Sequence, residues 1–99
     1  MKIITHGRRS GKTTKAVIEA AKTGNYIVVA NRYHRQGVLE IAEGLGLKVN
    51  VLTLQDIKNG EHYGLQLRTG KVIVDEAQVV LEQLLGMEVD MMILSEEEL

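Results

Sequence analysis

A glycine-rich, basic segment near the start of the chain has the composition of a phosphate-binding turn. It reads His6-Gly7-Arg8-Arg9-Ser10-Gly11-Lys12-Thr13 and lies between a short apolar run and a segment with helical periodicity. Successive backbone N–H groups in such a turn can surround a phosphate, and the start of the following helix adds partial positive charge. Gly11 lets the backbone approach the ligand, Lys12 can reach the β- and γ-phosphates, and the Thr13 hydroxyl can bind Mg²⁺. The spacing is that of a P-loop (Walker A motif), except that the pattern expects glycine where His6 stands.

The phosphate contacts expected of this loop extend over six positions. They are Gly7, Ser10, Gly11, Lys12, Thr13 and Thr14, and Thr14 resembles the position that often touches the α-phosphate. A chance Gly-Lys-Thr sequence in a turn is the alternative interpretation. A second motif is needed to decide between the two.

That second motif is an apolar run that ends in two acids, Val72-Ile73-Val74-Asp75-Glu76. It matches a Walker B box, in which Asp75 would hold Mg²⁺ and Glu76 would orient and polarise the attacking water. The alternative is a strand that happens to precede a helix start, where acids are favoured. The two motifs together indicate a site for a nucleotide with Mg²⁺, and ATP is the nucleotide that we expect.

Charge is unevenly distributed along the chain, although its formal net charge is only −1. Residues 1–37 contain eight of the twelve Lys and Arg residues and one acid, whereas residues 38–99 contain the other four and twelve acids. A basic N-terminal third suits an anionic ligand such as phosphate or nucleic acid, although surface charge can also simply be uneven.

The elements that must position these motifs follow from hydropathy and turn signals. We expect strands at 2–5, 26–30, 48–54, 71–75 and 89–94, helices at 12–23, 33–44 and 77–85, a helical turn at 55–60 and a loop at 61–70. Apolar strands separated by helices predict an α/β fold with a mostly parallel sheet. With the motifs, this order predicts a three-layer P-loop NTPase core with a five-stranded sheet and helices on both faces. One domain would span residues 1–95, followed by an acidic tail at 96–99.

Composition narrows the class of protein further. The 99-residue chain has room for one core, and it contains no cysteine, which excludes disulfides and thiolate metal sites. No apolar run approaches the roughly 20 residues that a membrane-spanning helix needs. We therefore expect a cytoplasmic protein that does not bind membranes.

The Walker B acids continue as Ala77-Gln78, and the loop contains Arg8 and Arg9. In this combination the chain resembles the ATPase domain of phage terminase large subunits and related superfamily-two helicase-like motors. The resemblance implies that Arg8 or Arg9 acts in cis on the γ-phosphate. It also implies that Leu94-Ser95 matches a strand end that couples nucleotide state to DNA, and that the segment with Arg32 and Arg35 contacts nucleic acid.

The chain also departs from the family that it resembles, since terminase ATPase domains are longer and are followed by a nuclease domain. We expect a minimal accessory ATPase, phage- or prophage-encoded, that works as a homo-oligomer or with a larger protein partner. One alternative is a degenerate P-loop interaction module with weak or no hydrolysis. Another is a relic that resembles thymidine kinases, whose loop ends in the same Ser-Gly-Lys-Thr, but here Val79-Val80 stands where their aromatic residues follow.

Overall fold

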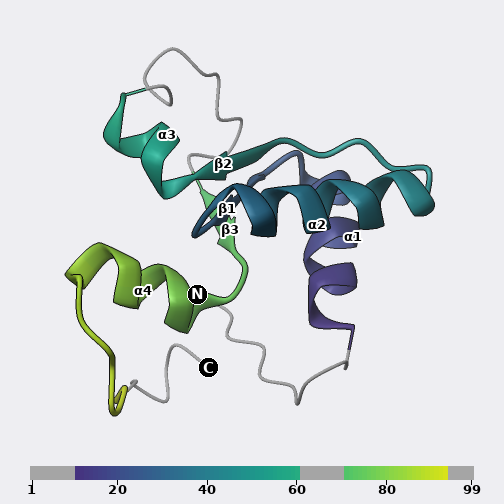
Figure 1. Cartoon of the computed structure of the whole chain (residues 1–99). Coiled ribbons are helices and arrows are strands. Elements are labelled where there is room, and N and C mark those ends of the chain that lie inside the picture. Colours follow the sequence, from purple (N-terminus) through teal and green to yellow (C-terminus); the bar gives the residue numbers. More distant parts are fainter. Residues whose placement is uncertain (1–10, 61–70, 94–99) are drawn as a thin grey trace.

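The computed structural model describes residues 11–60 and 71–93 of the chain. These residues form three strands and four helices in the order α1 (Lys12–Thr23), β1 (Tyr26–Val29), α2 (Arg32–Gly44), β2 (Val51–Thr53), α3 (Leu54–Lys58), β3 (Val72–Val74) and α4 (Ala77–Leu85). Figure 1 shows the strands crossing the middle of the molecule, with α1 and α2 packed beside each other. The expected strand at 2–5, the first five residues of the expected loop that begins at His6, and the expected loop at 61–70 lie outside the described residues.

The three strands form one parallel sheet in the order β2-β1-β3. Ile27 is in register with Val51 on one side of β1 and with Ile73 on the other. Because all three strands run in the same direction, their carboxyl ends meet at one edge of the sheet, where open α/β sheets bind their ligands.

Both faces of β1 are covered, and its successive residues point to opposite sides of the sheet, whereas Val72 and Val74 of β3 are 43% and 45% exposed. Ile27 and Val29 pack with the buried residues of α1 and α2, namely Val17, Ala20, Val38 and Ala42. Val28 and Ala30 pack on the other face with Leu54 of α3 and Val80 of α4. Burial on both faces explains why β1 is a continuous apolar run without polar alternation.

The helix boundaries follow from local chemistry. The backbone of Gly24 is left-handed, with φ of 81°, and its N–H donates to the Ala20 carbonyl at 2.8 Å, which ends α1. The Asn31 side chain accepts the His34 N–H at 3.0 Å, so α2 begins at Arg32. Thr53 and Asp56 form a reciprocal capping box, which ends β2 and places Leu54 in α3 rather than in a strand over 48–54.

The expected five-stranded, three-layer P-loop core is wrong, because the described residues form a small three-stranded parallel sheet with four helices. Residues 89–93, which we expected to enter a fifth strand, form no strand, and Ile93 is 88% exposed. An apolar run predicts a tendency toward burial, whereas a strand also needs a neighbouring backbone as hydrogen-bond partner. None of the three described strands provides that partner for 89–93.

Within the described ranges, the structure contains no helix whose length and apolar character would let it span a membrane.

Candidate functional site

The two motifs meet at the carboxyl edge of the sheet. Lys12 and Thr13 begin α1, whereas Asp75 and Glu76 follow β3 directly. The Asp75 N–H donates to the carbonyl of Val28 at 3.1 Å, which extends the pairing of β1 and β3 by one residue. This bond holds the aspartate at the sheet edge, opposite the first turn of α1.

Thr13 and Asp75 make the first contact between the motifs. The Thr13 Oγ1 hydroxyl donates to Asp75 Oδ2 at 3.1 Å, and Asp75 is buried, with 8% of its surface exposed. An octahedral Mg²⁺ with bonds of 2.0–2.1 Å holds adjacent oxygens about 3 Å apart, so this oxygen pair fits two neighbouring ligand positions. No group of three or more His, Cys, Asp or Glu side chains in the described segments could hold a metal. Thr13 and Asp75 could supply two of the six oxygens around a Mg²⁺ ion, and water or phosphate would have to supply the others.

Lys12 and Glu76 make the second contact. Lys12 Nζ lies 2.9 Å from Glu76 Oε1, and about a third of each side chain is exposed, 36% and 34% respectively. Ion pairs with this exposure contribute about 0.2–1 kcal/mol to stability. The pair is therefore weak enough for another anion to replace Glu76 at Lys12.

The backbone of Glu76 is unusual. Its φ of 55° and ψ of 57° are left-handed, and no other described residue except glycine has a positive φ. This conformation costs an L-residue about 1–2 kcal/mol. Such strain occurs preferentially at functional sites, where surrounding contacts maintain it.

The start of α1 has no side-chain cap among the described residues. Gly11 precedes the helix with φ of 78°, and no described side chain caps this end, whereas Asn31 and Thr53 cap α2 and α3. The first N–H groups of a helix have no partner within it, and together with the helix dipole they attract anions. A Cβ at Gly11 would meet no atom of the described residues within 4 Å, whereas the left-handed backbone by itself favours glycine here.

Several expected site residues are not tested by the structure. Gly7, Arg8, Arg9 and Ser10 lie outside the described residues, as do Leu94 and Ser95. Thr14 is half-buried in the first turn of α1. The cis role of Arg8 or Arg9 and the coupling role of Leu94-Ser95 therefore stay predictions.

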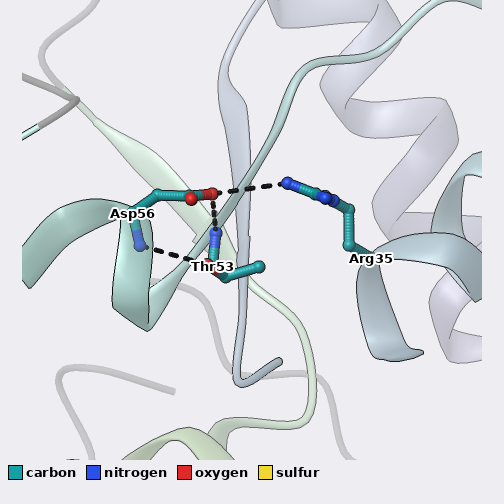
Figure 2. A network of polar contacts seen from close by, with 3 residues as sticks. All are labelled: Arg35, Thr53 and Asp56. Atoms are coloured by element: carbon teal, nitrogen blue, oxygen red, sulfur yellow. Dashed lines mark hydrogen bonds and ion pairs between the residues drawn. The ribbon is translucent and has the colours of Figure 1, made fainter. Parts of the chain in front are cut away.

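The structure gives Arg35 a partner within the protein. Arg35 Nη1 lies 3.6 Å from Asp56 Oδ2, and the same oxygen accepts the Thr53 N–H at 2.9 Å (Figure 2). Arg35 thus connects α2 to the capping box of α3. Arg32 is exposed, and the neighbouring Tyr33 is 88% exposed. Neither arginine has a hydrogen bond or ion pair to Lys12, Thr13, Asp75 or Glu76.

Two residues that hold helices in place, Asp56 and Gln83, were not predicted from the sequence. Asp56 was missed although Thr53-x-x-Asp56 has the spacing of a capping box, which is a local signal that could have identified it. Gln83 Nε2 donates to the Ala30 carbonyl at 2.7 Å and connects α4 to the end of β1. No local pattern marks Gln83, because its partner is far away in the sequence.

Comparisons with protein-family models, with curated proteins and with solved structures found no match.

Proposed function

We propose that this chain binds Mg²⁺–ATP by its phosphates and hydrolyses the anhydride bond between the β- and γ-phosphates, which yields ADP and phosphate. One observation carries the proposal: the first two residues of α1 contact the two acids that follow β3, through Thr13–Asp75 and Lys12–Glu76. An ammonium, a hydroxyl and two carboxylates, each with a distinct role in phosphoryl transfer, thereby occupy one edge of the sheet.

Phosphate binding would rest on the start of α1. The Lys12 ammonium would neutralise β- and γ-phosphate oxygens, and the N–H groups of the first turn would donate to them. Left-handed Gly11 turns the chain into this helix and itself adds no side chain at this point. The basic residues of the loop would add to the attraction for a triphosphate.

Mg²⁺ would be held by Thr13 and Asp75, whose oxygens already lie side by side. When bound, the ion would neutralise charge that develops on the phosphate oxygens. Asp75 is held by the Val28 carbonyl through its backbone, so its carboxylate is positioned before any ligand arrives.

Hydrolysis would require Glu76 to orient and polarise the attacking water once its carboxylate is free of Lys12. An arginine, Arg8 or Arg9 in cis or one from a partner, would stabilise the negative charge of the transition state. A partner protein or a second copy of the chain would complete the site, and the cysteine-free composition favours a cytoplasmic setting.

The test is calorimetric titration of Mg²⁺–ATP together with phosphate release by the same samples. Lys12→Ala should abolish binding, and Glu76→Gln should bind but not hydrolyse. Lys22→Ala, which removes the same charge from the exposed last turn of the same helix, should leave both unchanged. If the wild type binds no better than Lys12→Ala, nucleotide binding at this site is refuted. If it binds but releases no phosphate above the level of Glu76→Gln, hydrolysis is refuted.

Single-stranded nucleic acid is a second candidate ligand, favoured by the exposed Arg32 and the 88% exposed Tyr33 at the start of α2. Arginine would pair with backbone phosphates and tyrosine would stack on a base. Affinity for an oligonucleotide should fall with added salt and with Arg32→Ala. Arg35→Ala should have the smaller effect, because Arg35 is already paired with Asp56. Binding that is absent at low salt would end this candidate.

A further inference from the structure

In the proposed function the Lys12 ammonium binds phosphate, but in the structure it is already paired with a carboxylate. Lys12 Nζ contacts Glu76 Oε1 at 2.9 Å, and a carboxylate oxygen is the same kind of acceptor for an ammonium as a phosphate oxygen. The charged end of Lys12 can serve the phosphate fully only if Glu76 gives up this contact.

We propose that the Lys12–Glu76 ion pair is an autoinhibitory lock, in which Glu76 occupies part of the phosphate position until a phosphate displaces it. The proposal rests on the proposed function, because it concerns the same site. Before the ligand binds, the carboxylate that would activate water is held by Lys12. After the ligand takes Lys12, the carboxylate is released and can bind water.

The second contact allows the lock to open locally. Thr13 and Asp75 connect α1 to the end of β3 independently of Lys12, and the Asp75 N–H is bonded to Val28. Loss of the ion pair therefore leaves the start of α1 and the end of β3 together. What changes is the side chain of Glu76 and the backbone that carries it.

That backbone directly precedes α4. Glu76 is the N-cap residue of α4 and has a left-handed conformation that residues with a Cβ avoid. Its carboxylate is anchored by Lys12 on one side, and α4 is anchored farther along by Gln83 on the Ala30 carbonyl. Release of the carboxylate therefore removes the restraint that Lys12 places on the start of α4, whereas Val80 and Gln83 still hold this helix against Val28 and Ala30.

The expected size of the effect follows from exposure. An ion pair with about a third of each side chain exposed shifts an equilibrium by about 1.5- to 5-fold. A variant without the lock should therefore bind the ligand tighter by about this factor.

The experiment measures the affinity of the whole chain for Mg²⁺ with a non-hydrolysable ATP analogue by titration calorimetry. Glu76→Gln removes the charge, whereas Glu76→Asp keeps the charge but shortens the side chain by one methylene and withdraws it from Lys12. Glu19→Gln removes the same charge from an exposed position of α1, about 10 Å along the helix from Lys12. We expect both Glu76 variants to bind about 1.5- to 5-fold tighter than the wild type, and Glu19→Gln to bind like the wild type.

The following outcomes would overturn the lock or the proposed function. Tighter binding by Glu76→Gln alone would show that removal of charge, not release of Lys12, is responsible, and would overturn the lock. Equal or weaker binding by both Glu76 variants, with binding lost in Lys12→Ala, would overturn the lock and leave the proposed function standing. No binding by the wild type or any variant would refute the proposed function itself.

A second measurement needs no ligand. The unfolding equilibrium constant is measured in urea for the wild type, Lys12→Met, Glu76→Gln and the double variant. The factor by which the double variant changes this constant is then compared with the product of the two single-variant factors. A coupling of about 1.5- to 5-fold supports the ion pair as described. Additive changes would show that the ion pair, and with it the lock, does not exist in solution.

Discussion

Glu76 provides the sharpest test of the structure, because its backbone conformation can be separated from its side-chain contact. Glu76→Gly and Glu76→Ala both remove the carboxylate that pairs with Lys12. Each variant therefore loses the stability that the ion pair provides, about 0.2–1 kcal/mol. The two variants differ only in their backbone preferences. Any difference in their stability therefore reports on the left-handed conformation, with φ of 55° and ψ of 57°.

The magnitude is the balance of two opposing terms. Relief of the left-handed strain favours glycine by about 1–2 kcal/mol, whereas the greater freedom of glycine in the unfolded chain costs about 0.5–1 kcal/mol. The N-cap position adds to the preference for glycine over alanine. We expect Glu76→Gly to be more stable than Glu76→Ala by about 1 kcal/mol, which for a domain of this size is a rise in Tm of roughly 4–8 °C.

The assay is urea unfolding followed by far-UV circular dichroism, with wild type and both variants in the same buffer. A matched pair at Gln78, exposed within the first turn of α4, provides the control. There glycine should be less stable than alanine by about 0.5–1 kcal/mol, since the backbone is helical. If Glu76→Ala proves as stable as Glu76→Gly while the Gln78 pair behaves as expected, the left-handed conformation of Glu76 is refuted.

The remaining predictions concern Thr13, Gly11 and the capping box of α3. Thr13→Val should cost about 1–3 kcal/mol, because it leaves the buried carboxylate of Asp75 without its hydroxyl partner, and Thr13→Ser should recover most of this stability in urea unfolding. The same valine variant should lose the Mg²⁺-dependent part of nucleotide affinity, and an unchanged difference between titrations with Mg²⁺ and with EDTA would contradict the metal role. Gly11→Ala should cost about 1 kcal/mol for conformational reasons, since a Cβ there meets no described atom within 4 Å, and a thermal melt identical to wild type would contradict this. Asp56→Ala should lower the free energy of unfolding by about 1–2 kcal/mol through loss of the capping box, whereas Arg35→Ala should lower it by under about 1 kcal/mol. Equal losses in denaturant unfolding would show that the ion pair matters more than the cap.

Helices with local signals at their ends were predictable from the sequence. The expected helices at 12–23 and 77–85 match α1 and α4, because left-handed glycines at 24 and 86 end them. The central strand at 26–30 was confirmed to within one residue, since its continuous apolar character is typical of a strand buried on both faces. The spatial meeting of Lys12 and Thr13 with Asp75 and Glu76 was also expected, because the two motifs were interpreted as parts of one nucleotide site.

Strand pairing was not predictable in the same way. The apolar run at 89–93 indicated a fifth strand, yet it forms none, because pairing depends on which backbones lie beside it rather than on its own hydropathy. β2 is shorter than expected, since Thr53 is its last residue and also caps α3 through Asp56. Arg35 was expected to contact nucleic acid, but its contact with Asp56 arises only when α2 and α3 are brought together (Figure 2).

The sequence by itself determined the chemistry available to this protein: a glycine before a Lys-Thr helix start, and an Asp-Glu pair after an apolar strand. Those features are local, and residue type and spacing encode them. Only the tertiary structure decided that Lys12 is paired with Glu76, that Thr13 donates to Asp75, and that Glu76 has a left-handed backbone. These depend on the packing of α1 against the end of β3, two segments far apart in the chain, and on contacts that outweigh the local preference of a single residue.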